Sequence, residues 1–210
     1  MADLEALKTA IVAGDRGGST RNAAEAIADG TDPRTIMDTM TAAMAEVGRR
    51  FQANELFVPE MLISARAMKE AMALLEPVLV KADIRPEWTA VVGTIQGDLH
   101  DIGKNLVAMM LRGANIKVID VGTNVPAERF IEAARESNAS LIGISALLTT
   151  TMTGMGAAVL AIRAAGLPGV KIMVGGAPVT PEFANQIGAD AYAPDAASAV
   201  DVAKQTVAAG

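Results

Sequence analysis

The chain has one histidine, His100, and it lies in the segment Gly97-Asp98-Leu99-His100-Asp101-Ile102-Gly103. A neutral imidazole is a good ligand for a transition metal, and its other nitrogen usually donates to a carboxylate, which here could be Asp98. Gly103 has no side chain to obstruct a bulky ligand. The spacing predicts a metal-ligating histidine, but a histidine that caps the next helix or binds an anion there would fit equally well.

The absence of cysteine limits the chemistry that is available. It excludes disulfides, cysteine-ligated iron–sulfur clusters, thiol nucleophiles and cysteine-based zinc sites. Any imidazole chemistry must use His100, and residue counts alone do not exclude a Ser-His-Asp triad.

Two further segments contain small or hydroxyl residues that could contact a ligand. Ser145-Ala146-Leu147-Leu148-Thr149-Thr150-Thr151 offers hydroxyl groups, although serine and threonine also commonly cap helices. Gly175-Gly176-Ala177 permits a close backbone approach, although a tight turn would explain the glycines as well.

The elements that would position these segments lie after Trp88, where β-rich runs alternate with helical stretches. We expect strands at 90–95, 116–121, 141–145, 170–174 and 191–192, and helices at 102–113, 127–137, 152–165, 181–187 and 196–208. Alternation of this kind predicts an α/β fold with a parallel sheet covered on both faces. In the flavodoxin-like order 2-1-3-4-5, the loops 96–103, 145–151 and 175–180 would meet at one edge, where such sheets bind ligands. The sequence alone does not fix that order.

The first part of the chain is predicted to be helical. Asp32-Pro33 is typical of a helix start, and apolar residues recur at helical spacing at 4, 7, 11, then 36, 40, 44, 47, then 61, 65, 68, 72, 75. We expect an N-terminal four-helix bundle in which the last helix begins to end at Pro77, followed by a polar linker at 81–87. The predicted domains are a helical cap at 1–85 and an α/β domain at 86–210.

Charge and hydropathy exclude some partners. The formal net charge is −6 and no basic stripe is evident, so nucleic acid is not expected. The apolar runs are shorter than the roughly 18 residues of a membrane span, and the acidic N-terminus does not resemble a signal peptide. We therefore expect a cytoplasmic protein without a membrane partner.

Taken together, the motifs resemble the cobalamin-binding domain of methionine synthase and of corrinoid methyl-carrier proteins. That family's signature is Asp-x-His-x-x-Gly, then Ser-x-Leu, then Gly-Gly, which Asp98, His100 and Gly103, Ser145 and Leu147, and Gly175 and Gly176 match in order. The likeness continues through Lys104-Asn105. Segments 47–51, 57–60 and 64–69 resemble the family's helical cap module.

The resemblance implies that cobalamin binds base-off/His-on, with His100 replacing the cofactor's own base below the cobalt. Asp98 would bond to His100, and Thr151 would continue the chain where methionine synthase has serine. Phe51 and Val58 would cover the methyl-bearing face. The implied cofactor-binding residues of the α/β domain are Asp98, His100, Asp101, Ile102, Gly103, Ser145, Leu147, Thr149, Thr151, Gly175, Gly176 and Ala177.

The resemblance also implies a function. The chain would be loaded as methylcobalamin and would shuttle a methyl group via cobalt between a substrate methyltransferase and an acceptor methyltransferase, in a methylamine or O-demethylation system with a separate reductive activator. It has no room for the roughly 250 residues of a barrel that would bind a methyl donor or acceptor, so it should be a carrier whose cap moves about the linker. Alternatives are the cobalamin-binding subunit of a mutase, a cobalamin-dependent sensor, and an unrelated nucleotide-binding flavodoxin-like domain.

Overall fold

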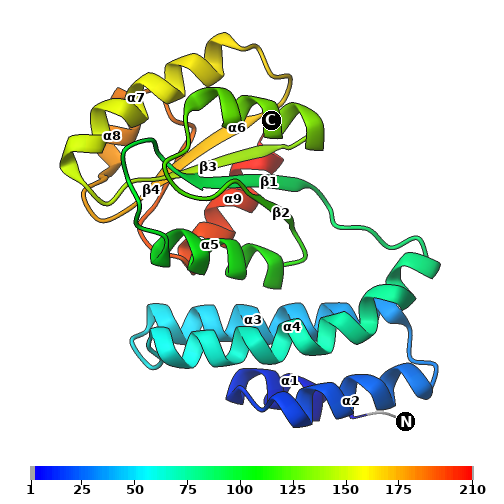
Figure 1. Cartoon of the computed structure of the whole chain (residues 1–210). Helices are drawn as coiled ribbons and strands as arrows, with labels where there is room; N and C mark the ends of the chain where they lie inside the picture. Colours follow the sequence, from blue (N-terminus) through cyan, green and yellow to red (C-terminus); the bar gives the residue numbers. More distant parts are fainter. Residues whose placement is uncertain (1–2, 210) are drawn as a thin grey trace. The chain divides into compact units, whose positions relative to one another are not determined.

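The computed structural model describes residues 3–209 and divides the chain into two compact units. The first comprises the chain up to Glu87 together with Gly113–Asn115, and the second comprises Trp88–Arg112 and the chain from Ile116 onward. The first unit is helical and the second contains the sheet (Figure 1). No helix within residues 3–209 is long and apolar enough to cross a membrane.

The helical unit contains helices that pack on one another as predicted. They are α1 (Leu4–Ala13), α2 (Arg16–Ala28), α3 (Pro33–Gln52) and α4 (Val58–Lys81). Three of them begin with an aspartate whose carboxylate accepts a backbone N–H of the first turn: Asp3, Asp15 and Asp32. Leucine, isoleucine, alanine and methionine side chains fill the core, among them the buried Met40, Met44 and Met61.

The end of α4 differs from the expectation. The prediction that the helix begins to end at Pro77 is wrong, because α4 continues through this proline to Lys81. Proline removes one intrahelical hydrogen bond and so weakens a helix without forbidding it. Leu75 and Leu79, on either side of Pro77, are buried, and burial of their side chains stabilises the last turn.

The second unit is built on a parallel sheet, which within residues 88–209 has five strands in the order β2-β1-β3-β4-β5. This confirms the order 2-1-3-4-5. The strands are β1 (Thr89–Thr94), β2 (Lys117–Asp120), β3 (Leu141–Ser145), β4 (Lys171–Gly175) and β5 (Ala191–Ala193). All of β1 and most of β3 and β4 are buried, as expected for central strands covered on both faces.

Helices cover both faces of this sheet (Figure 1). Helices α6 (Ala127–Ser137), α7 (Thr149–Ala164) and α8 (Pro181–Gln186) lie on one face, and α5 (Ile102–Gly113) and α9 (Ser198–Ala208) lie on the other. The fully buried Phe130 of α6 and Met155 of α7 belong to the hydrophobic cluster on the first face.

Helix α7 begins three residues earlier than the predicted residue 152, so the expected loop 145–151 is partly helical. Leu148 is extended and precedes the helix, and the Thr151 hydroxyl donates to the Leu148 carbonyl at 2.8 Å. Thr149, Thr150 and Thr151 form the first turn of α7. A hydroxyl that donates to an earlier carbonyl, as that of Thr151 does, is compatible with a helix end.

Candidate functional site

Three of the predicted segments meet at one edge of the sheet. Thr94, Ser145 and Gly175, the last residues of β1, β3 and β4, are neighbours in register. The Ile95 amide also donates to the Ser145 carbonyl at 2.9 Å, and the Ala146 amide donates to the Gly175 carbonyl at 3.1 Å. The loops that hold His100, Leu147 and Gly176 thus start side by side, at the point where the strand order reverses.

Within this edge His100 is bound by the carboxylate of Asp98. The Oδ1 atom of Asp98 lies 2.7 Å from the ring Nδ1 of His100 and also accepts the backbone N–H of His100 at 3.0 Å. Asp98 is fully buried, whereas the side chain of His100 is 51% exposed. One ring nitrogen is therefore held from inside the protein while much of the ring is open to a ligand.

The second carboxylate oxygen of Asp98 is bound by another loop. Oδ2 accepts the backbone N–H of Leu147 at 2.6 Å and that of Leu148 at 3.2 Å. Burial acts to raise the pKa of Asp98, but these amides together with the amide and ring of His100 outweigh it and lower the pKa to about 2. Since the carboxylate is ionised and can only accept, Nδ1 of His100 carries the proton in this hydrogen bond.

Thr151 lies next to the carboxylate of Asp98, but its hydroxyl has a closer acceptor elsewhere. Its Oγ1 lies 3.3 Å from Oδ2 of Asp98 and 2.8 Å from the Leu148 carbonyl oxygen. A hydroxyl has one hydrogen to donate, and the shorter contact is to Leu148. The predicted series His100, Asp98, Thr151 is present in space, and the backbone amide of Leu147 is the closest partner of Oδ2.

The loops next to His100 expose several large apolar side chains. Leu99 and Ile102, on either side of the histidine in the sequence, are 74% and 71% exposed, and Leu147 and Leu148 on the facing loop are also exposed. Exposed apolar side chains in the loops beside a polar group are typical of a ligand site.

The reason why a position requires glycine differs among the glycines of the motifs. A Cβ atom on Gly176, which has φ +123°, would lie 1.9 Å from the Ala146 carbonyl oxygen, and one on Gly175 would lie 2.8 Å from that of Ala193. These two glycines are therefore required by the protein's own backbone. At Gly103 such a Cβ would meet no described atom within 4 Å apart from its chain neighbours and the backbone of its own helix, so contact with other elements does not explain this glycine and leaves room for a ligand.

The remaining predicted residues lie as follows. The carboxylate of Asp101, directly before α5, accepts the side-chain amide of Asn105 at 3.0 Å. Thr149, the first residue of α7, and Ala177, in the loop after β4, are both exposed. Phe51 near the end of α3 and Val58 at the start of α4 are half-buried residues of the helical unit.

Thr94 is a site residue that the sequence analysis missed. Its buried hydroxyl donates to the His100 carbonyl at 2.9 Å and also lies 2.9 Å from the hydroxyl of Ser145. In the sequence it is one residue of an apolar run, and a hydroxyl at the end of a buried strand was the only available signal.

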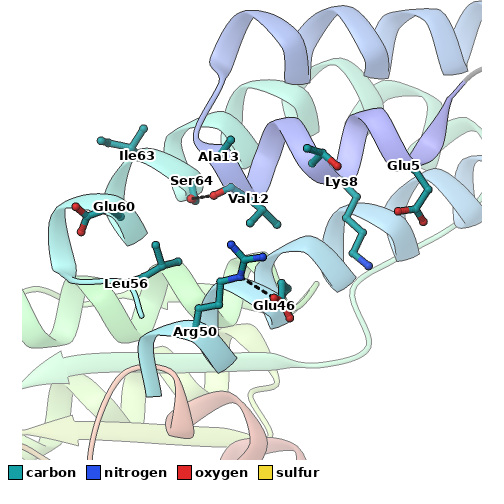
Figure 2. A pocket seen from close by; sticks show the side chains of 11 residues that line it. Glu5, Lys8, Val12, Ala13, Glu46, Arg50, Leu56, Glu60, Ile63 and Ser64 are labelled. Carbon is teal, nitrogen blue, oxygen red and sulfur yellow. Dashed lines mark hydrogen bonds and ion pairs between the residues drawn. The ribbon is translucent and has the colours of Figure 1, made fainter. Parts of the chain in front are cut away.

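A separate hollow of about 510 Å³ lies in the helical unit (Figure 2). Arg50 donates to Glu46 at 2.7 Å beside it, and the Ser64 hydroxyl donates to the Val12 carbonyl at 3.0 Å in its wall. It shares no residue with the loops around His100, and its lining carries both charge signs: Glu5, Lys8, Thr9, Val12, Ala13, Glu46, Arg50, Leu56, Glu60, Ile63 and Ser64.

The donor set at the His100 site suits a metal that brings most of its ligands with it. Among the described residues, no three histidine, cysteine, aspartate or glutamate side chains are grouped so that they could hold an ion. His100 can supply a single nitrogen from an apolar surface. That arrangement suits a metal whose other ligands come with it in a flat macrocycle, and the apolar side chains would face the ring.

Comparison with known proteins finds matches over most of the chain. Residues 88–201 and residues 3–76 each match a family described as "B12 binding domain". The chain is 43% identical to trimethylamine corrinoid protein 1 of Methanosarcina mazei, over 87% of this chain and 86% of that protein. It is also 43% identical to the dimethylamine corrinoid protein of Methanosarcina barkeri, over 84% of each.

A solved structure extends the likeness to the whole fold. The methanol:cobalamin methyltransferase complex MtaBC from Methanosarcina barkeri contains a chain that matches with a TM-score of 0.87 and 28% identity, over 99% of this chain and 80% of that one.

Proposed function

The chain belongs to the B12-binding family, and we propose that it is a corrinoid protein that carries a methyl group between methyltransferases. The observation that carries the proposal is the half-exposed ring of His100, held through Nδ1 by a buried carboxylate within an apolar surface. When bound, the corrinoid supplies a cobalt that accepts and releases the methyl group.

His100 is proposed as the lower ligand of the cobalt, in the base-off/His-on mode. Because Asp98 is ionised and holds the proton on Nδ1, the lone pair of a neutral imidazole is at Nε2, the nitrogen that Asp98 does not bind. The hydrogen bond to a carboxylate also makes that nitrogen a better donor to a metal. Thr94 holds the His100 carbonyl, so backbone and ring are fixed separately.

The other predicted residues are assigned by proposal to the surroundings of the cofactor. Ile102 and Leu147 would contact the corrin, and the open space at Gly103 would admit its edge. The residues proposed near the nucleotide tail are Ser145, Thr149, Gly175, Gly176 and Ala177, with Asp101 and Thr151 supporting the loops. The helical unit would be the cap over the methyl-bearing face, with Phe51 and Val58 as its contacts.

A methylated amine is the proposed source of the methyl group. Relatives named for trimethylamine and for dimethylamine are equally identical to this chain, so the comparisons favour methylamines over O-demethylation without choosing among the amines. The proposed partners are a substrate methyltransferase, an acceptor methyltransferase and a reductive activator, in the cytoplasm. These relatives favour a methyl carrier over a mutase subunit or a sensor.

Reconstitution with cobalamin tests the proposal. The apoprotein is mixed with methylcobalamin, excess cofactor is removed, and the visible spectrum and cobalt content are measured. We expect one corrinoid per chain with a spectrum of a nitrogen-ligated form, and a base-off spectrum for His100→Ala. Failure of the wild-type protein to retain a corrinoid would refute the function, and an unchanged spectrum in the variant would refute the ligand.

A further inference from the structure

The loop after β2 binds the backbone of Asp98, and this loop belongs to none of the motif segments. The amide of Asn124 donates to the Asp98 carbonyl at 2.9 Å, and its side-chain Oδ1 accepts the N–H of Gly97 at 2.8 Å. The two bonds hold the two-residue segment Gly97–Asp98 at both ends. His100 follows two residues later.

The conformation at this contact suits the residues that form it. Asn124 has φ +55° and Gly97 has φ +88°, both in the left-handed region. Asparagine is one of the few residues other than glycine that adopts this region readily. Asn124 is also exposed, so its side chain is bound to Gly97 without being part of the core.

The loop that carries Asn124 is itself held firmly. The Thr94 amide donates to the Gly122 carbonyl and the Val125 amide donates to the Thr94 carbonyl, both at 2.9 Å. The Gly122 amide donates to Oδ1 of Asp120 at 2.9 Å. Pairing between β1 and β2 thus continues past the end of β2. The loop holds Asn124 in place, and Asn124 in turn binds the Gly97–Asp98 segment.

Asp98 therefore connects two loops. Its carboxylate is bound by amides of the loop after β3, at Leu147 and Leu148, while its backbone is bound by the loop after β2, at Asn124. Loss of the second attachment would leave the carboxylate bound by Leu147 and Leu148 but would release the Gly97 amide and the Asp98 carbonyl from the loop after β2.

We propose that Asn124 is a positioning residue that acts through Gly97 and Asp98 to fix the ring of His100 for ligation of the corrinoid cobalt. The part of this proposal that concerns the corrinoid cobalt rests on the proposed function. The effect of Asn124 on the hydrogen bond between His100 and Asp98 does not, and it can be measured in the apoprotein.

Three substitutions separate the side-chain acceptor from the backbone conformation. Asn124→Gly permits the left-handed conformation, keeps the amide that binds Asp98, and removes the acceptor for Gly97. Asn124→Asp keeps an acceptor oxygen at the same place. Asn124→Ala removes the acceptor and disfavours the conformation. Thermal unfolding checks that each variant folds, as expected for an exposed position.

The first readout is the ring of the single histidine in tag-free apoprotein labelled with ¹⁵N-histidine. We expect wild type and Asn124→Asp to show one tautomer, protonated at Nδ1, and Asn124→Gly to show averaged tautomers. The second readout is the visible spectrum after reconstitution with cobalamin. We expect the ratio of His-ligated to base-off corrinoid to fall about fivefold to tenfold in Asn124→Gly, the effect of one hydrogen bond, and further in Asn124→Ala.

Two results would overturn the proposal. One is an Asn124→Gly protein with the wild-type ring spectrum and ligated fraction, and the other is an Asn124→Asp protein that behaves like Asn124→Gly. If wild-type protein binds no cobalamin, the proposed function fails, while the apoprotein ring spectra still decide whether Asn124 positions His100.

Discussion

Oδ2 of Asp98 lies 2.6 Å from the backbone nitrogen of Leu147, a residue 49 positions further along the chain. The other oxygen of the same carboxylate holds the His100 ring. The residue that orients the proposed metal ligand is thus also the residue that joins the loop after β1 to the loop after β3. Removal of this carboxylate should affect both the fold and the site.

Asp98→Asn should destabilise the apoprotein. An amide has one acceptor oxygen, so its NH₂ group would face either the backbone N–H of Leu147 or the backbone N–H of His100, and a buried donor would be left without an acceptor. We expect a loss of about 3 kcal/mol in the free energy of unfolding by urea. His100→Ala, which leaves the backbone bonds of Asp98 intact, is the control and should cost under about 1 kcal/mol. Equal losses in the two variants would contradict this.

Thr151 should matter less to the histidine than Asp98 does. Its hydroxyl is closer to the Leu148 carbonyl than to Asp98. We expect Thr151→Val to lower stability by about 1 kcal/mol and to leave the ¹⁵N signals of the His100 ring unchanged, with Thr151→Ser as the control that keeps the hydroxyl. A change in the ring signals as large as that in Asp98→Asn would show that the hydroxyl is the main partner of the carboxylate.

A buried ion pair should stabilise the start of α5. The ammonium of Lys104 is almost fully buried and lies 2.6–2.7 Å from both carboxylate oxygens of Asp120 at the end of β2. Lys104→Met leaves that carboxylate without its cation, and we expect a loss of about 2 kcal/mol in unfolding free energy.

The double variant is the control for this pair. Asp120→Asn added to Lys104→Met removes the unpaired charge but keeps an oxygen that can accept the Gly122 amide. It should recover part of the stability. A double variant less stable than Lys104→Met would mean that the charge of Asp120 stabilises the fold without Lys104.

The helical unit should lose stability in acid through Glu46. Hydrogen bonds from Arg49 and Arg50 lower the pKa of Glu46 from 4.5 to about 2. A carboxyl whose pKa is lower in the folded state stabilises the fold above its unfolded pKa, and that contribution is lost as the pH falls from about 4.5 to about 2. We expect Glu46→Gln to lower the melting temperature near neutral pH and to converge with wild type near pH 2.

Glu25→Gln, which makes the same charge change on the exposed part of α2, is the control. High salt should shrink the Glu46 effect, because the ion pairs are accessible to solvent. A difference between Glu46→Gln and wild type that is constant from neutral pH to pH 2 would show that the ion pairs are not its cause.

Much of the fold is predictable because it follows from periodic patterns. Alternating apolar runs and helical stretches predict the parallel sheet, and the order that brings three loops together is the observed one. The start of α7 and the passage of α4 through Pro77 are not predictable in this way. They depend on local hydrogen bonds at Thr151 and on burial of Leu75 and Leu79, both of which need tertiary structure.

The site is predictable where side-chain type carries the chemistry. His100 and Asp98 combine a metal ligand with a carboxylate, and the structure brings them together. The partner from Leu147 is a backbone N–H, which every residue other than proline has, so the residue's type gives no signal. The sequence gives no signal for Asn124 either, because its role depends on contact with Gly97, which lies 27 residues earlier in the chain. The cofactor contacts of Phe51 and Val58 remain predictions.

The most direct test is electron paramagnetic resonance of the cobalt(II) form, with protein labelled by ¹⁵N-histidine and cobalamin of natural isotopic composition. The only histidine is His100, so an axial nitrogen from the protein must be the labelled one. We predict that the nitrogen splitting changes from triplets in unlabelled protein to doublets in labelled protein, because ¹⁵N has spin one half. Triplets that persist with the label would show that the cofactor's own base is still the ligand, and would contradict the account.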